Sequence, residues 1–230
     1  NSAAVPLTLA MGMTFIILLG SIDLSVEGAM SGAAMVLVLL ASNDSNAHNY
    51  GWLAMLAAIA ASTLMGLMSG ALQTVLRIPS FMATLGVWFI GLGLSVYMLG
   101  GSAVRLMDEN IRGLALTRFL ALPLAVWVAL AAFIVAIVIQ YHTRFGRHVL
   151  ALGGGEDIAE FSGVSPRRVR IYAFGLAGFF FGLAGVLAAA QLGQSNATIA
   201  DGRLFAAVTA VVVGGTALTG GEGGVLNTLV

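Results

Sequence analysis

"IYAFGLAGFFFGLAGVLAAAQL", residues 171–192, continues for 22 positions without a charged side chain. A helix of about 20 apolar residues is long enough to cross the hydrocarbon core of a bilayer. Backbone amides have no water to bond there, so the segment is predicted to be a transmembrane helix. Four glycines within it recur at spacings of three and four, which predicts close packing against neighbouring helices: Gly175, Gly178, Gly182 and Gly185.

The rest of the chain has the same character. It is 59% hydrophobic and 9% charged over 230 residues, whereas soluble domains carry about 25% charged residues. We therefore expect an all-α polytopic membrane protein embedded in the lipid bilayer. About seven transmembrane helices are predicted, at 3–22, 26–41, 52–76, 81–100, 120–140, 171–192 and 204–219.

The ends and the composition add further expectations. The chain begins with Asn1 and stops inside a hydrophobic run, so 1–230 is expected to be a single transmembrane domain truncated at both ends. The net charge is zero, which gives no indication of a nucleic-acid partner. No cysteine is present, which excludes disulfides and thiolate metal sites within this stretch.

The connections between the segments predict an orientation. The 141–170 connection carries five arginines, and the tight connection around Arg77 is predicted to lie on the same side. Connections 42–51 and 193–203 contain one basic residue between them and are assigned to the other side. The positive-inside rule then places 141–170 in the cytoplasm. The 101–119 connection does not fit, because it is predicted to be external yet has three arginines.

Residues 153–170, "GGGEDIAEFSGVSPRRVR", form a polar island in this apolar chain. Gly153–Gly155 are expected to release the chain from the preceding element. "EDIAEFSG" can then form about two helical turns, with Gly163 at the C-cap and Ser165-Pro166 starting the next helix. One interpretation is a solvated loop. The other is a docking helix for a cytoplasmic partner, with Ile158, Ala159 and Phe161 as its contact face.

A family resemblance favours the second interpretation. "FGRHVLALGGGEDIAEFSGVSPRRVRIYAFGLAGFFFGLAGVLAA", residues 145–189, resembles the coupling region of permease subunits from bacterial ABC sugar importers. These are of the ribose, xylose and simple-sugar type, related to branched-chain amino-acid permeases. The G-x-N-E-x-A-A-x-x-S-G-I pattern of the family is matched at six positions: Gly154, Glu156, Ala159, Ser162, Gly163 and Val164. Gly155 replaces the usual Asn, and Ile158 replaces the first Ala.

Three other stretches resemble the same family in the same order. "LLGSIDLSVEGAM" (18–30) is similar to its G-G-I-D-L-S-V-G motif, with Ser21 and Glu27 in place of glycines. The others are "IPSFMATLG" (78–86) and "AAVTAVVVGGTALTGGEGGVLNTL" (206–229).

The resemblance implies a function, partners and an ATPase-coupling helix. The function is the membrane-spanning subunit of an ATP-driven importer of a sugar or similar neutral solute, in the bacterial inner membrane. The partners are a cytoplasmic ATP-binding subunit, a periplasmic sugar-binding protein and a second permease copy, identical or related. ATP is then bound by the partner, and this chain is not an enzyme and binds no cofactor. The coupling-helix residues are Gly154, Glu156, Ile158, Ala159, Glu160, Phe161 and Gly163.

Acidic residues adjoin the apolar segments at three positions, Asp23, Glu27 and Glu222. Charges at membrane depth usually face a bundle interior or a cavity. Aligning 20–32 with 215–227 places Glu27-Gly28 on Glu222-Gly223, which suggests an internal repeat. Helix breaks at corresponding places indicate a transport pathway. The candidate pathway or helix-break positions are Asp23, Ser25, Glu27, Gly28, Gly221, Glu222 and Gly223. The alternative is that 22–25 and 219–224 are tight cytoplasmic hairpins, with Asp23 and Ser25 forming a turn and an N-cap.

Two other function classes each require a feature of their own. An ion-coupled secondary transporter needs buried ionisable residues, and only those three acids qualify. An intramembrane enzyme needs a catalytic constellation, and the sequence predicts no catalytic residue. The three histidines are too far apart in sequence to suggest a metal site. No Walker A pattern occurs, so ATP binding by this chain is not expected.

Overall fold

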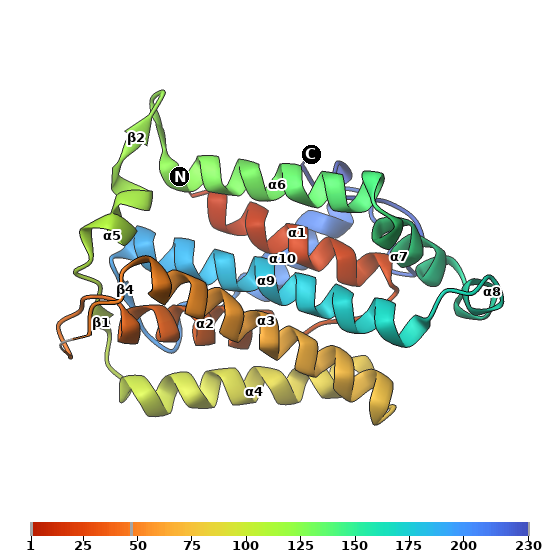
Figure 1. Cartoon of the computed structure of the whole chain (residues 1–230), viewed down its shortest axis with the longest axis horizontal. Coiled ribbons are helices and arrows are strands. Elements are labelled where there is room, and N and C mark those ends of the chain that lie inside the picture. Colours follow the sequence, from red (N-terminus) through yellow and green to blue (C-terminus); the bar gives the residue numbers. More distant parts are fainter. Residues whose placement is uncertain (1, 47, 230) are drawn as a thin grey trace.

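The structure is a computed structural model that describes residues 2–46 and 48–229. It is a bundle of helices with four very short strands (Figure 1). The helices are α1 Ala4–Leu18, α2 Val26–Leu40, α3 Trp52–Val75, α4 Ser80–Leu99, α5 Glu109–Leu116, α6 Leu124–His142, α7 Arg144–Gly154, α8 Glu156–Phe161, α9 Pro166–Leu192 and α10 Arg203–Val213, followed by a 3₁₀ turn at Asn227–Leu229. The strands are β1 Val104–Arg105, β2 Arg118–Phe119, β3 Leu122–Pro123 and β4 Gln194–Ser195.

All seven predicted segments contain a helix, but only four of these helices are long and apolar enough to cross a membrane. These four are α3, α4, α6 and α9. The other three, α1, α2 and α10, have 15, 15 and 11 residues. The prediction of one helix over 204–219 is wrong in its second half, because α10 ends at Val213 and the glycine-rich chain turns at Gly214–Gly215. The predicted count of seven transmembrane helices is therefore not confirmed, because only four helices of the described residues are long enough to cross a membrane by themselves.

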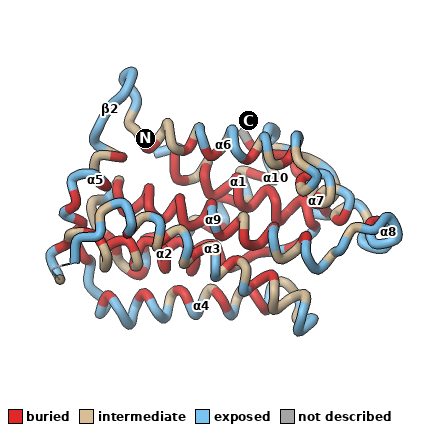
Figure 2. The backbone as a smooth tube through the Cα atoms, viewed as in Figure 1, coloured by how far each residue is buried: buried red, intermediate tan, exposed pale blue. Residues whose placement is uncertain are grey.

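Helix α9 is the centre of the bundle. It is almost wholly buried, whereas α3, α4 and α6 each keep an exposed face, as Figure 2 shows. The predicted glycine packing is confirmed: a Cβ on Gly178 would lie 2.5 Å from the Ser62 carbonyl oxygen of α3, and one on Gly185 would lie 2.5 Å from the Met30 carbonyl oxygen of α2. The Ser62 hydroxyl donates a 2.7 Å hydrogen bond to the Gly178 carbonyl across the same contact. Glycines thus let α9 touch its neighbours backbone to backbone.

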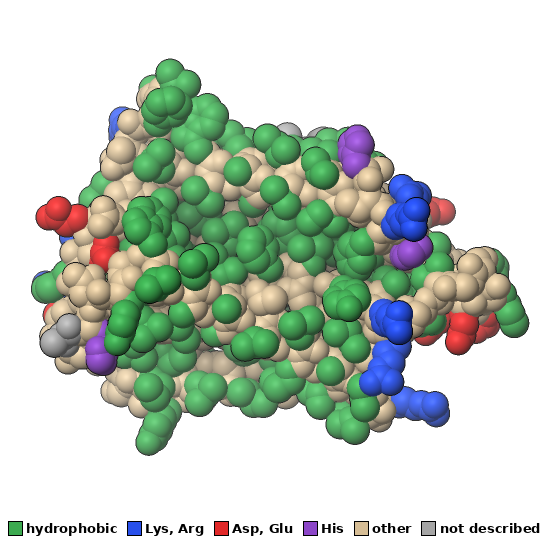
Figure 3. All heavy atoms as spheres, viewed as in Figure 1, with side chains coloured by type: hydrophobic (Ala, Val, Ile, Leu, Met, Phe, Trp, Pro, Cys, Tyr) green, Lys and Arg blue, Asp and Glu red, His purple; other side chains and the backbone are tan. Residues whose placement is uncertain are grey.

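The two ends of the bundle differ in charge. Helices α7 and α8 lie at one end together with the turn between α3 and α4, and arginine side chains gather there (Figure 3). Arg77 from this turn and Arg167 and Arg170 from the first turns of α9 line a single cavity at this end. We call this the arginine-rich end. At the opposite end β1 pairs with β4, and Asn43 bridges to Leu106. The predicted grouping of the connections on two sides is therefore confirmed.

Helix α7 was not predicted as a helix. Its sequence "RFGRHVLALGG" buries Gly146, Val149 and Leu152 at spacings of three, while its other face is polar. Thr143 precedes it as N-cap, and its hydroxyl oxygen accepts a 3.2 Å hydrogen bond from the Gly146 amide. A short amphipathic helix with a cap thus leads from α6 to α8.

Candidate functional site

Helix α8 is the two-turn helix predicted for the polar island. It follows Gly155, whose backbone is extended, and ends in a Schellman motif. The Val164 amide donates to the Ala159 carbonyl at 3.0 Å, and the Gly163 amide donates to the Glu160 carbonyl at 2.9 Å. Gly163 has φ +83°, a conformation that favours glycine. The predicted C-cap at Gly163 is confirmed, and the helix boundary is encoded locally.

Two details of that prediction are wrong. Gly153 and Gly154 are the last residues of α7, so only Gly155 breaks the chain between the two helices. Ala159 does not share an outer contact face, because it is 3% exposed and packs among Leu18, Val149 and neighbouring apolar residues. A six-residue helix needs an inward side chain to hold it against the bundle, and Ala159 is that residue.

The outward face of α8 is apolar at its centre and acidic around it. Ile158 is 72% exposed and Phe161 is 92% exposed. Asp157 and Glu160 are exposed beside them. Two large apolar side chains are therefore exposed on a helix that lies outside the apolar body of the bundle.

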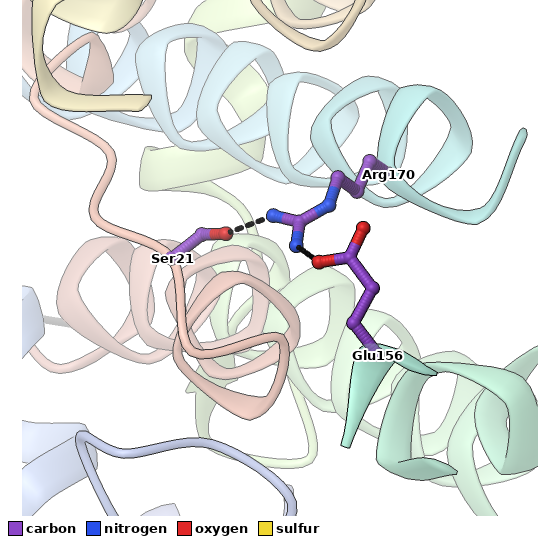
Figure 4. Close-up of polar contacts among 3 residues, drawn as sticks. All are labelled: Ser21, Glu156 and Arg170. Carbon is purple, nitrogen blue, oxygen red and sulfur yellow. Dashed lines mark hydrogen bonds and ion pairs between the residues drawn. The ribbon is translucent and has the colours of Figure 1, made fainter. Parts of the chain in front are cut away.

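Arg170 joins α8 to the chain between α1 and α2 (Figure 4). One guanidinium nitrogen forms an ion pair with the Glu156 carboxylate at the start of α8. The other donates a 3.1 Å hydrogen bond to the Ser21 hydroxyl. A single side chain from α9 therefore contacts both the exposed helix and the 19–25 segment.

Three glycine-containing backbones meet beside this link. The Gly221 amide donates a 2.9 Å hydrogen bond to the Leu18 carbonyl at the end of α1. A Cβ on Gly153 would overlap that same carbonyl oxygen and would lie 2.5 Å from the Gly221 nitrogen. A Cβ on Gly220 would lie 2.6 Å from the Gly20 nitrogen. We call this contact of 18–20, 153–154 and 219–221 the glycine junction.

The segment around Glu222 is a loop at the arginine-rich end. The side-chain amide of Gln140, in α6, forms two hydrogen bonds with this loop. Its nitrogen donates to the Gly223 carbonyl at 3.3 Å, and its oxygen accepts from the Val225 amide at 2.6 Å. Gly221 and Gly223 have φ +76° and +113°. Glu222 itself is exposed. Glu222 therefore does not lie in the interior of the bundle, and its place in a transport pathway stays a prediction.

The chain between α1 and α2 enters the bundle without a helix. The Leu24 amide donates a 3.0 Å hydrogen bond to the Thr84 hydroxyl, one turn inside α4. A Cβ on Gly28 would lie 2.5 Å from the Trp88 carbonyl oxygen, a further turn along α4. With a rise of about 1.5 Å per residue, α2 begins roughly 6–12 Å inside the end of α4. Segment 22–25 is therefore a non-helical stretch set inside the end of α4, and we call it the first helix break.

Asp23 and Ser25 form the turn at this break. The Asp23 Oδ1 atom accepts hydrogen bonds from the Ser25 amide at 2.7 Å and from the Ser25 hydroxyl at 2.6 Å. Ser25 occupies the N-cap position of α2, but its hydroxyl bonds to Asp23 and caps no helix amide. The expected turn is confirmed, and the expected side-chain cap is wrong.

A second break lies at 196–202, within the predicted connection 193–203, but its depth in the bundle was not predicted. After β4 at the opposite end, three successive reverse turns carry the chain to α10. The first amides of α10 meet α2: the Leu204 amide donates a 3.1 Å hydrogen bond to Glu27 Oε1. Glu27 lies about 20 Å along α2 from its far end, so this contact is well inside the bundle. Asn196 and Asp201-Gly202 are turn signals that fit the reverse turns of this connection, whereas its depth depends on the contact with α2.

Glu27 caps α10 from another helix. Its side chain is 8% exposed, and its carboxylate fills the position that an N-cap residue takes. The aligned residue Glu222 is exposed in a loop, so the two acids of the suggested repeat do not share an environment. The alignment of 20–32 with 215–227 is thus not matched by similar surroundings.

We expect Glu27→Ala to lower the stability of the full-length protein, because the buried Leu204 amide loses its acceptor. The cost should be about 1–3 kcal/mol. Glu27→Gln keeps an acceptor oxygen and should lie within about 1 kcal/mol of the parent. Thermal unfolding in mild detergent measures both, and equal midpoints for the alanine variant and the parent would contradict this role.

Within residues 2–46 and 48–229, no group of three or more His, Asp or Glu side chains lies close enough together to hold a metal ion. The predicted site residues divide into three sets. Glu156, Ile158, Glu160 and Phe161 belong to α8 at the arginine-rich end. Asp23, Ser25, Glu27 and Gly28 lie at the first helix break, and Gly221, Glu222 and Gly223 lie in the loop that Gln140 holds.

Comparison with known proteins gives a consistent result. Residues 1–228 match the family described as branched-chain amino acid transport system / permease component. The chain is 39% identical over 155 residues to the probable ABC transporter permease protein YphD of Escherichia coli K12, covering 67% of this chain and 47% of that protein. It is 32% identical to the ribose import permease protein RbsC of the same strain, covering 96% of this chain and 69% of that protein.

The L-arabinose ABC transporter permease protein AraH of Azospirillum brasilense is 30% identical, covering 97% of this chain and 65% of that protein. No solved structure gives a significant match. The long apolar helices and these relatives indicate a multi-pass protein of the inner membrane. The chain belongs to the branched-chain amino acid transport system permease family.

Proposed function

We propose that this chain is the membrane-spanning subunit of an ATP-driven importer of a sugar or similar small neutral solute. The observation that carries the proposal is α8, a capped helix outside the apolar body of the bundle with Phe161 92% exposed. The relatives named for ribose and L-arabinose support a sugar as the solute.

The proposed partners follow from this assignment. A cytoplasmic ATP-binding subunit docks on Ile158 and Phe161, with Gly154, Glu156, Ala159, Glu160 and Gly163 shaping and holding the helix. ATP is bound and hydrolysed by that subunit, and this chain is neither an enzyme nor a cofactor-binding protein. A periplasmic sugar-binding protein delivers the solute at the opposite end. A second permease copy, identical or related, completes the path.

The two non-helical segments, 21–25 and 196–202, also extend the short helices α2 and α10 in the proposed membrane topology. Segment 21–25 precedes α2 and segment 196–202 precedes α10, and both lie beside other helices of the bundle. We count each of these non-helical segments together with its helix as one proposed crossing. With α1 they bring the proposed number of crossings in this stretch to seven, and discontinuous helices of this kind line solute paths in transporters.

A second candidate is an ion-coupled secondary transporter. Asp23 and Glu27 are ionisable and buried, as such a mechanism requires. Glu27 is already bonded to the Leu204 amide, which leaves Asp23 as the remaining coupling group.

The test is co-purification of the tagged full-length permease from its native membrane in mild detergent. We expect an ATPase subunit to be recovered with the parent. The double variant Ile158→Asp with Phe161→Asp should reduce its recovery by about tenfold or more, since exposed aromatic anchors dominate docking energies.

Leu120→Asp is the matched control. Leu120 is 73% exposed at the opposite end of the bundle, and its φ of +48° suits aspartate. It should leave recovery of the ATPase unchanged. A parent that brings down no ATPase would contradict the importer and favour the ion-coupled alternative. Equal recovery with the double variant would contradict α8 as the docking helix.

A further inference from the structure

A small cavity lies where the first helix break meets α10. It has a volume of about 200 Å³ and is lined mainly by apolar side chains of α1, α10 and the chain between α1 and α2. Phe205 and Val208 of α10 line one wall, and Ser21 and Asp23 line another. Ligand pockets for drug-sized molecules measure about 300–1,000 Å³, so this cavity suits a single small ring.

Asp23, which lines this cavity, has one buried carboxylate oxygen without a partner. The residue is 1% exposed, and Oδ1 accepts both hydrogen bonds from Ser25. Oδ2 is buried and has no hydrogen-bond partner among the described residues. A buried acceptor that the protein does not satisfy calls for a donor from elsewhere. The buried oxygens of Ser69 and Ser195 also lack partners, but neither residue lines this cavity.

The mouth of the cavity is apolar and open. Ile22, Phe205 and Leu218 are 59%, 75% and 61% exposed at its rim. A monosaccharide has hydroxyl donors on its edge and apolar C–H groups on its ring faces, which match one acceptor beside an exposed aromatic ring. A solute carrying a carboxylate would be repelled by Asp23. A hard cation would need several oxygen ligands where the cavity offers one carboxylate and one hydroxyl.

We propose that Asp23 Oδ2 accepts a hydrogen bond from a hydroxyl of a neutral monosaccharide as it passes through the membrane. This inference rests on the proposed importer function and assigns a recognition point within it. Ser21, on the same segment, is bonded to Arg170, so this point is linked to α8.

The experiment uses the full-length permease reconstituted in liposomes with its ATPase and binding protein. ATP-driven uptake is measured for D-ribose and L-arabinose and for the monodeoxy derivatives of each. In the parent, the deoxy sugar that lacks the hydroxyl donating to Asp23 should be taken up about tenfold more slowly. This is the fold-change expected from losing one hydrogen bond to a charged group. In Asp23→Asn, which keeps an acceptor for Ser25 and replaces Oδ2 by a donor, that penalty should disappear.

The comparison removes the contribution of the binding protein. The binding protein presents the same sugar and deoxy sugar to the parent and to Asp23→Asn. Its own preference for one of them therefore cancels when the deoxy penalties of the two transporters are compared. Ser69→Ala removes another buried unpartnered oxygen, in α3, and should keep the parent pattern. Equal deoxy penalties in the parent and Asp23→Asn would overturn the inference and leave the importer intact. Absence of ATP-driven uptake of every sugar by the parent would overturn the importer, and the inference with it.

A labelling measurement does not depend on the stability of Asp23→Asn. The 230 residues contain no cysteine, so Val208→Cys introduces a single thiol into this stretch, at the cavity wall. A saturating transported sugar should slow its modification by a small methanethiosulfonate by about tenfold, as expected for a site occupied most of the time. An unchanged rate in a variant that still transports would overturn the inference.

Discussion

Gly153→Ala should prevent the arginine-rich end from packing and lower the free energy of unfolding by at least about 3 kcal/mol. The new Cβ would overlap the Leu18 carbonyl oxygen and approach the Gly221 nitrogen to 2.5 Å. Both neighbours are backbone atoms, so no side chain can rotate away, and the 2.9 Å hydrogen bond between them would be disrupted. Thermal unfolding of the full-length protein in detergent should show a midpoint lower by about 10 °C.

Gly154→Ala is the matched control, one residue further along the same helix. A Cβ there meets no atom within 4 Å. Alanine favours the helical conformation over glycine by about 1 kcal/mol, so this variant should be as stable as the parent or slightly more stable. If the two variants unfold at the same temperature, the glycine junction is not a close backbone contact.

Arg170→Met should separate ATP hydrolysis from transport. The variant loses the ion pair with Glu156 and the hydrogen bond to Ser21, while α8 keeps its outward face for docking. We expect uptake of sugar per ATP hydrolysed to fall by about tenfold or more, within the usual range of coupling energies. The permease with its ATPase and binding protein in liposomes allows uptake and hydrolysis to be measured on the same preparation.

The fold itself should survive this change. The Arg170 and Glu156 side chains are 22% and 48% exposed, and ion pairs in such positions contribute about 1 kcal/mol or less. Arg168→Met is the control, because Arg168 is exposed two residues earlier and should leave the uptake ratio unchanged. An Arg170→Met transporter with the parent ratio would show that Arg170 only anchors the helix.

Local signals in the sequence predicted α8 well. The Gly163 cap, the break before Glu156 and the start of α9 at Pro166 each depend on a residue type and its immediate neighbours. The apolar segments were also found, since a long uncharged run in a membrane protein leaves little choice but a helix. Helix ends within the bilayer were predicted less well, as the second half of 204–219 illustrates.

Contacts between distant residues could not be predicted from this one sequence. Arg170 and Ser21 are 149 residues apart, and Glu27 and Leu204 are 177 apart. The inward position of Ala159 depends on where α8 lies against α1 and α7, which a six-residue pattern does not specify. Gly153 was interpreted as a helix breaker, because glycine has the same sequence signal whether it breaks a helix or admits another backbone.

The glycine junction has a mechanical consequence. A contact made through side chains can absorb part of a displacement by changing rotamers, whereas two backbones in direct contact cannot. A shift of α7 would therefore move the end of α1 by a comparable distance, because no side chain lies between the two backbones to absorb part of the movement. Glycine, usually the residue of flexible chain, is here the residue that brings the two backbones into direct contact.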